Sequence, residues 1–278
     1  AQFSASEDYY QKRINIDIHE WLCFPPEAIQ KTLWRRRPIM KILYTDLKRA
    51  FVAVIGTLAL SFSLIGKAEP VMNLITINTS DGAGYAAWAK GSAEAISKSN
   101  NAMAMGLCSP VAGAEQMGDQ YLWSFFDSQT TAWSNTSQNP TVRKEVAKMK
   151  VKRTIKEWDN WRILRAAPTN SDGGYFWNLI VKAENAASYL NSLDKLNVAL
   201  KENGHDVTMQ VFMADTGRRA GQFMVSLSAT DGAILGAAMD DRTQPWFTEI
   251  LASLDGSREY VHGFALQCET YYSQPQQQ

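Results

Sequence analysis

The 278-residue sequence predicts an α+β fold built from two similar halves. The pattern Gln-aromatic-aliphatic-x-Ser-apolar occurs at residues 120–125 and returns 102 positions later, at 222–227. The tripeptide Asn-Leu-Ile at 73–75 returns 105 positions later, at 178–180. Around both pairs the chain reads as strand, helix, strand, strand, helix, strand. Two matches in the same order and at nearly the same offset indicate an internal duplication.

In the first half, apolar and β-rich segments bounded by turn residues predict four strands, at 71–78, 102–108, 120–127 and 158–166. Ser80-Asp81-Gly82 supplies a turn and an N-cap for an Ala-rich helix at 85–97, which has one apolar stripe. A second helical region is predicted from Ser128 to Lys156, with a break at Pro140.

The second half repeats this order. Strands are predicted at 175–182, 207–214, 222–229 and 260–270. Helices are predicted at 186–202 and from Asp231 onward, with a break near Pro245. A turn-rich segment around Pro168 separates the halves, so the predicted units are 69–167 and 174–272. The Gln-rich tail at 273–278 is expected to be disordered.

The order βαββαβ is that of a ferredoxin-like unit, in which two helices cover one face of a four-stranded sheet. The other face of such a sheet must be covered. The sequence resembles the dimeric α+β barrel superfamily, in which two ferredoxin-like units bring their sheets together. Both units lie in one chain here, so the resemblance implies a monomeric pseudo-dimer. Families of similar architecture include cofactor-independent monooxygenases of the antibiotic-biosynthesis type, haem-handling enzymes and ligand-sensing domains.

Residues 40–68 have the pattern of a secretory signal peptide. Met40 is followed by a basic segment and an apolar run at 50–66. Small residues stand at positions −3 and −1 of a cleavage site after Ala68. Cleavage after Ala68 would give a periplasmic or secreted protein with no membrane contact; an uncleaved anchor helix is the alternative. Residues 1–39 are interpreted as upstream sequence foreign to the native protein, or as a long cytoplasmic tail.

Composition restricts the partners. Hydrophobic residues make up 45% of the chain, which excludes a mostly disordered protein. Lys and Arg number 28 and so do Asp and Glu, so no basic excess indicates a nucleic-acid partner.

Cysteine and histidine are sparse downstream of the predicted signal. Cys108 and Cys268 remain there, with His205 and His262 and no CxxC spacing, so no metal site is predicted. In the fold that the sequence resembles, the edge strands carrying the two cysteines meet. The resemblance therefore implies a Cys108–Cys268 disulfide, with two unpaired buried thiols as the alternative.

Alternation along the strands predicts which side chains reach a space between the sheets. Tyr121, Trp123 and Phe125 are all apolar, as are their counterparts in the second half, and both sets are expected to face the helices. The opposite sets are mixed, and they are expected to face the other half or a pocket. The candidate ligand-binding residues chosen on this basis, with others from the first and last strands, are Asn73, Ser124, Asn178, Gln222, Ser226 and His262.

His262 is the only histidine on a predicted strand, and it is a candidate general base or axial haem ligand. A hydrogen-bonded packing role is the alternative. Asn73 and Asn178 occupy equivalent positions in the repeat, so both are expected near the ligand; edge or cap hydrogen bonding is their alternative. Ser124 and Ser226 lack a GxSxG context, which disfavours a hydrolase.

The sequence therefore predicts an exported protein that binds a small, partly apolar molecule in an α+β barrel. By resemblance it has either a cofactor-independent monooxygenase-like or a haem-handling activity. No cofactor is required by any motif, and haem is the one that the resemblance allows. The alternative is a non-catalytic structural or interaction module whose sheets pack without a cavity.

Overall fold

The computed structural model describes residues 69–134, 138–166 and 173–275. The predicted signal peptide, the segment before it and most of the predicted linker lie outside these residues. None of the helices in the described ranges is long and apolar enough to cross a membrane.

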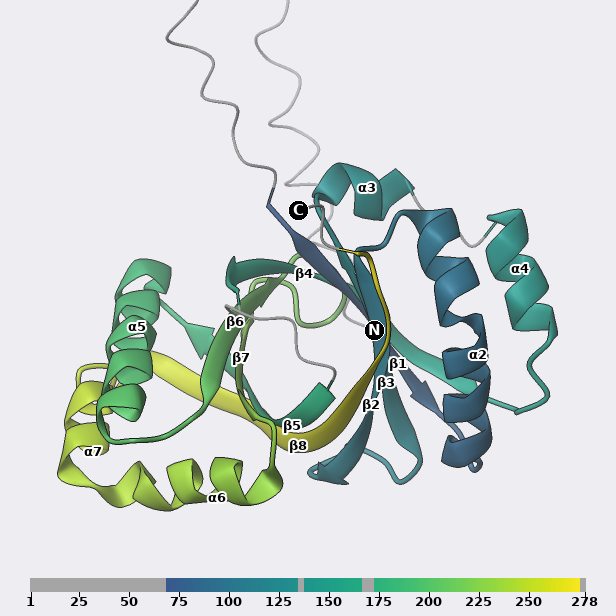
Figure 1. The fold of residues 1–278 in the computed structure, drawn as a ribbon. Coiled ribbons are helices and arrows are strands. Elements are labelled where there is room, and N and C mark those ends of the chain that lie inside the picture. Colours follow the sequence, from purple (N-terminus) through teal and green to yellow (C-terminus); the bar gives the residue numbers. More distant parts are fainter. Residues whose placement is uncertain (1–68, 135–137, 167–172, 276–278) are drawn as a thin grey trace, which may run out of the picture. The chain divides into compact units, whose positions relative to one another are not determined.

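Eight antiparallel strands close into a barrel in the order β1-β3-β2-β8-β5-β7-β6-β4 (Figure 1). The elements of the first half are β1 (Val71–Asn78), α2 (Gly82–Asn100), β2 (Ala104–Ala112), β3 (Asp119–Phe126), α3 (Gln129–Ser134), α4 (Pro140–Ala147) and β4 (Thr154–Arg165). Those of the second half are β5 (Gly173–Ala183), α5 (Ala186–Glu202), β6 (Thr208–Ala214), β7 (Phe223–Ala229), α6 (Gly232–Asp240), the 3₁₀ helix η1 (Asp241–Thr243), α7 (Pro245–Ala252) and β8 (Arg258–Ser273).

The two halves place their strands in corresponding order. The first runs β4-β1-β3-β2 and the second runs β8-β5-β7-β6, and two antiparallel seams, β2 with β8 and β4 with β6, close the ring. The chain thus has an α+β fold with a closed barrel, as the resemblance to dimeric α+β barrels implies. Because every strand edge within the described ranges is paired, none of these edges is open to another chain.

Helices cover the outside of the barrel on two sides. Figure 1 shows α2 and α4 beside the strands of the first half, and α5, α6 and α7 around those of the second. Each side has its own core: Tyr85 and Ile96 of α2 pack with Met105 and Leu122, and Tyr189 of α5 packs with the second-half strands. A third cluster fills part of the barrel interior. Strands β1 and β3 therefore carry apolar side chains on both faces.

Local sequence signals account for the helix starts. Asp81 caps α2 by accepting a hydrogen bond from the Gly84 backbone N–H at 2.8 Å, and Asn185 caps α5 in the same way. Pro140 is not a break inside a helix but the first residue of α4, which Asn139 caps.

The predicted continuation of this helix to Lys156 is wrong. Helix α4 ends at Ala147, and β4 starts at Thr154, where it pairs with Asn78 of β1. The backbone hydrogen bonds of this segment go to the β1–β4 ladder, which overrides the helix propensity of the Lys-rich sequence.

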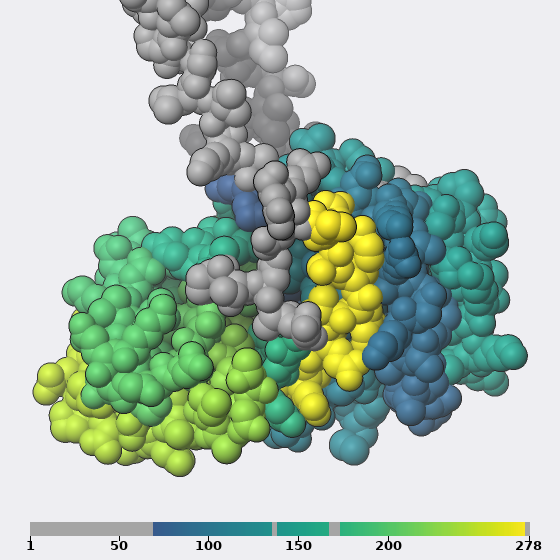
Figure 2. All heavy atoms as spheres, viewed as in Figure 1, coloured from purple at the N-terminus to yellow at the C-terminus, as the bar shows by residue number. Residues whose placement is uncertain are grey.

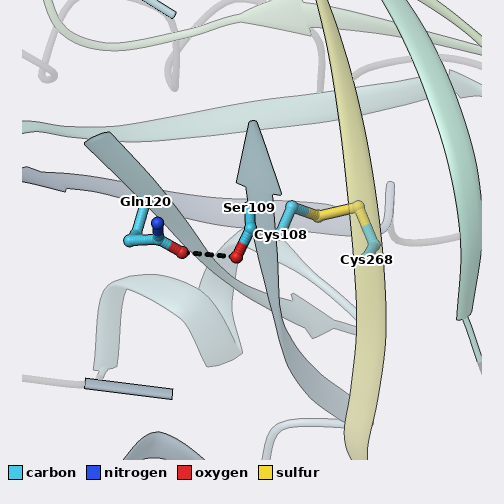
Figure 3. Close-up of a disulfide and its surroundings, with 4 residues drawn as sticks. All are labelled: Cys108, Ser109, Gln120 and Cys268. Atoms are coloured by element: carbon cyan, nitrogen blue, oxygen red, sulfur yellow. Dashed lines mark hydrogen bonds between the residues drawn. A yellow bond between two sulfur atoms is a disulfide. The ribbon is translucent and has the colours of Figure 1, made fainter. Parts of the chain in front are cut away.

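The predicted disulfide is confirmed. Cys108 of β2 and Cys268 of β8 lie opposite each other across the seam, with their Cα atoms 3.9 Å apart (Figure 3). On the outer side of the same region, Ser109 donates a hydrogen bond to Gln120 of β3 at 2.6 Å. The bond joins the halves across a sequence separation of 160 residues.

Replacing both cysteines by serine is expected to lower the free energy of unfolding by up to about 5 kcal/mol, because the bond restricts a long loop in the unfolded chain. Urea unfolding with and without reductant measures this. The reductant should destabilise the wild-type chain and leave the Cys108→Ser/Cys268→Ser variant unchanged; equal sensitivity of both would contradict the assignment.

Candidate ligand-binding site

The barrel encloses a cavity of about 1080 Å³. Its mouth lies where β8 ends and β2 and β6 begin, between Met103, Asp206 and Gln274. Figure 2 shows the end of β8, in yellow, on this face between atoms of the first half and atoms of the second. An eight-stranded barrel has room inside for one small ligand, and this cavity is of ligand size.

The wall from the first half is apolar. Met72 and Leu74 of β1, Trp123 and Phe125 of β3, and Ile163 of β4 point into the cavity. The indole of Trp123 lies against Gly106 of β2, where an added Cβ would come within 2.3 Å of the ring. The glycine therefore makes room for a large aromatic side chain in the wall.

The wall from the second half is mixed. Asn178 of β5, Ser226 of β7 and Gln210 of β6 are register neighbours across three adjacent strands, and all line the cavity. Thr208 and Ser228 continue these polar positions toward the mouth. Apolar side chains of the same strands also line the cavity: Phe176, Phe212 and Met224. The cavity is thus amphipathic, with buried amide side chains from the second half and apolar side chains from both halves.

Asn178 carries an unpaired donor. Its side chain is only 4% exposed, and its Nδ2 atom has no hydrogen-bond partner in the structure. A buried amide N–H without a partner costs free energy, so such groups are rare in native proteins. A ligand in the cavity would satisfy it.

The charged residues lining the cavity, Lys98 and Asp206, both lie at the mouth. Among the described residues no carboxylate, ammonium, guanidinium or imidazole lines the cavity inside the barrel. The deeper wall includes Tyr121, whose ring stacks on Phe264 with centroids 5.5 Å apart. Burial, together with the carboxylates of Asp119 and Glu115, raises the pKa of Tyr121 to about 12, so its hydroxyl stays neutral.

Of the six candidate residues, Asn178 and Ser226 line the cavity. Asn73 and Ser124 oppose each other on β1 and β3 and do not line it, because their neighbours Met72, Leu74 and Trp123 point inward. On the outer face, Asn73 donates to Asn160 of β4 at 2.7 Å. Asn73 and Asn178 are therefore not equivalent in space.

Gln222 and His262 do not line the cavity either. Gln222 precedes β7, and its Oε1 atom is buried without a partner. The His262 ring stacks on Phe264 at 5.3 Å, and its Nε2 atom is also buried without a partner.

The expectation that Tyr121, Trp123 and Phe125 face the helices is wrong. All three line the cavity, whereas Leu122 between them packs against α2. The second-half assignment is right: Phe223, Val225 and Leu227 pack under the helices. A shift of one residue along a strand moves every side chain to the other face of the sheet. The alignment of Gln120 with Gln222 is shifted by one residue in this sense, so aligned residues of the two halves point to opposite faces.

Gln210 and Thr208 were missed by the sequence prediction. The signal was present, since β6 alternates polar Thr208 and Gln210 with apolar Met209 and Val211. This is the pattern of a strand with one face on a core and one face on a polar space.

The opposite end of the barrel is closed by charged side chains from both halves. Arg219 of the β6–β7 loop contacts Glu115 of the β2–β3 loop at 2.6 Å, and Arg218 contacts both Glu115 and Glu157. Lys156 lies 2.8 Å from buried Asp119. The two arginines link the β6–β7 loop to the first half, whereas Lys156 and Asp119 pair within the first half.

Asp159 of β4 is the exception in this group. It is buried beneath Gly217 of the β6–β7 loop and has no ion pair within the described ranges. Burial and the nearby Glu157 carboxylate raise the pKa of Asp159 above its ordinary value, outweighing Arg219 and Arg218.

The donor groups do not fit a haem held by histidine or cysteine. His262 is not in the cavity wall, and the two cysteines there are bonded to each other. Among the described lining residues, Lys98 at the mouth is the only cation available to a haem propionate. No group of three metal-binding side chains occurs in the part of the chain that the structure describes.

No protein-family model matches the sequence, and no curated protein matches it. Solved structures of similar shape include a candidate monooxygenase from Lactobacillus acidophilus, with 10% identity, a TM-score of 0.49, and coverage of 73% of this chain and 95% of that chain. A haem-binding protein from Thermus thermophilus has 8% identity, a TM-score of 0.46 and coverage of 72% and 91%. A DypB variant from Rhodococcus jostii in complex with haem has 11% identity, a TM-score of 0.45 and coverage of 76% and 96%. Similarity at this level does not establish a family or an activity.

Asp159→Asn is expected to increase the free energy of unfolding at neutral pH. Folding raises the pKa of Asp159, so the ionised carboxylate destabilises the folded state. The wild-type chain therefore loses stability as pH rises from the ordinary range of aspartate through the raised pKa. The gain in the variant should therefore shrink as pH falls toward the ordinary range of aspartate. Chemical denaturation across this pH range measures it.

Asp119→Asn is the matched control with the opposite sign. Burial would raise the pKa of Asp119, but hydrogen bonds from Lys156, Asn78 and the Gln116 backbone outweigh it and lower that pKa. This variant should lose stability at neutral pH, and the loss should shrink in acid. A stability loss in both variants at neutral pH would contradict the assignment for Asp159.

Proposed function

We propose that this protein binds a small, neutral, partly apolar molecule that carries a hydrogen-bond acceptor. The observation that carries the proposal is the unpaired Nδ2 donor of Asn178 in the wall of the cavity. Ser226 and Gln210 beside it offer further polar groups, and Trp123 and Phe125 offer a stacking surface on the other wall. A charged ligand is disfavoured because no charged side chain lines the described interior to compensate it.

A cofactor-independent monooxygenase-like activity is the catalytic form of this proposal. The lining residues inside the barrel offer amides and hydroxyls rather than a carboxylate or imidazole base, so proton removal would depend on the acidity of the ligand itself. Binding is therefore the function to test first. The alternative of a structural module with tightly packed sheets is disfavoured by a cavity of about 1080 Å³.

The architecture is proposed to be two tandem ferredoxin-like units, 69–167 and 174–272, forming a monomeric pseudo-dimer. The corresponding strand orders of the halves support this, as does their joining through two similar antiparallel seams. We also propose that the protein is exported to the periplasm or secreted. The Cys108–Cys268 disulfide supports this, because such bonds persist in oxidising compartments.

The cavity proposal predicts that Asn178→Leu weakens binding of 1-naphthol by roughly fivefold to tenfold, the value of one hydrogen bond, and leaves binding of naphthalene nearly unchanged. Quenching of tryptophan fluorescence provides the readout, since Trp123 lies in the wall. A naphthoquinone and haemin complete the panel.

Asn73→Leu is the matched control because Asn73 lies on the outer face of the barrel. It is expected to change stability but not the affinity for any member of the panel. Equal loss in both variants, or no binding of any member to the wild-type chain, would overturn the proposed function.

A further inference from the structure

A second surface, on the outside of the barrel, carries two exposed tryptophans joined by a line of polar side chains. We call it the β4 strip; its members are Trp158, Asn73, Asn160, Arg162, Asp215, Gln129 and Trp133. It crosses β4, the neighbouring β1, the start of the β6–β7 loop and helix α3. Figure 1 shows α3 near the start of β1. Hydrogen bonds join β1 to β4, and α3 and β4 to the β6–β7 loop.

The two indoles are exposed but fixed. Trp158 is 51% exposed and Trp133 is 61% exposed, whereas Trp161 on the inner face of β4 is 1% exposed. The Nε1 atom of Trp158 donates to Asn73 at 2.8 Å, and that of Trp133 donates to Gln129 at 2.8 Å. Each ring therefore has its polar atom satisfied and much of its apolar surface in water, without free rotation.

Hydrogen bonds from each ring form a chain of side chains, and one backbone bond joins the two chains: the Asp215 N–H donates to the carbonyl oxygen of Asn160 at 2.8 Å. Asn73 donates to Asn160 at 2.7 Å, Gln129 donates to Asp215, and Arg162 donates to Asp215 through Nε at 2.7 Å. These bonds leave the Nδ2 atom of Asn160 and the Nη2 atom of Arg162 as donors for a ligand. Trp158 and Arg162 are four residues apart on one strand, about 13 Å. Trp133 is linked to Arg162 through Gln129 and Asp215.

The charges on the strip compensate one another. Arg162 contacts Asp215 at 2.7 Å and Glu69 at 3.4 Å, so its positive charge is shared by two carboxylates. A strip with no uncompensated positive charge is a poor site for nucleic acid or another polyanion. Its partner is expected to be neutral.

We propose that the β4 strip binds a neutral oligosaccharide. A sugar ring has an apolar C–H face, which packs on an indole, and hydroxyl groups at its edge, which accept and donate hydrogen bonds. Fixed aromatic faces together with amide and guanidinium donors match both features. The surface is separate from the cavity, so this inference does not depend on the proposed function.

The test uses the full chain and native affinity electrophoresis in gels containing a soluble β-glucan or mannan, followed by calorimetry with cellohexaose and chitohexaose. At least one neutral glycan should bind. Trp158→Ala and Trp133→Ala should each weaken its binding about tenfold, the effect of losing one stacked aromatic contact. Trp158→Phe keeps a ring face and should retain most of the affinity.

Tyr260→Ala is the matched control, an exposed aromatic outside the strip. It should bind as the wild type does, and binding should not depend on salt. Failure of all neutral glycans to bind, or unchanged affinity in the Trp158→Ala/Trp133→Ala variant, would overturn the proposal. Salt-sensitive binding of heparin or single-stranded DNA in place of neutral glycans would overturn it too, as would a protein partner that occupies the strip.

Discussion

Closure of the barrel is the constraint on which the rest of the structure depends. Two four-stranded sheets, each covered by helices on one face, leave four edges and two apolar faces exposed. Pairing β2 with β8 and β4 with β6 removes all four edges and turns the uncovered faces inward. The cavity exists because this closure leaves a space that the inward side chains do not fill. The disulfide lies at one of the two seams and contributes to the cavity wall, so it supports the closed ring and the site together.

The two halves use the same architecture for different chemistry. Inward positions of β1 and β3 carry methionine, leucine and aromatic residues, whereas those of β5, β6 and β7 carry asparagine, glutamine, threonine and serine together with Phe176, Phe212 and Met224. Two identical subunits would have to present the same wall twice, whereas two halves of one chain can differ. Under the proposed function, a ligand would lie with its polar atoms toward Asn178 and with an apolar part toward Trp123.

The sequence was sufficient for the order of the elements, and with the family resemblance for the disulfide, but not for the direction of every side chain. Strand β3 packs against α2 on one face and lines the barrel interior with the other, so Leu122 and Trp123 are both apolar although they point in opposite directions. Alternation therefore carries little information about side-chain direction in β3. The alignment of Gln120 with Gln222 is one residue out of step with the inward and outward positions of the two strands, so it assigned the wrong face to the residues of β3. In β6 and β7 one face is polar and alternation does identify the inward set. His262 stacks on Phe264, which lies two residues further along β8, as the alternation of a strand predicts. That the cavity reaches Phe264 but not His262 depends on tertiary packing, which no local pattern encodes.

Strand β4 connects the two proposed sites and also keeps them separate. Its residues alternate between Asp159, Trp161 and Ile163 on the inner face and Trp158, Asn160 and Arg162 on the outer face. The inner set belongs to the barrel core and the cavity wall, while the outer set forms most of the β4 strip. Adjacent side chains of a strand point to opposite faces, so a substitution in one set leaves the contacts of the other intact. A change at Trp158 therefore acts on the outer surface alone, whereas a change at Trp161 acts on the packing that supports the cavity.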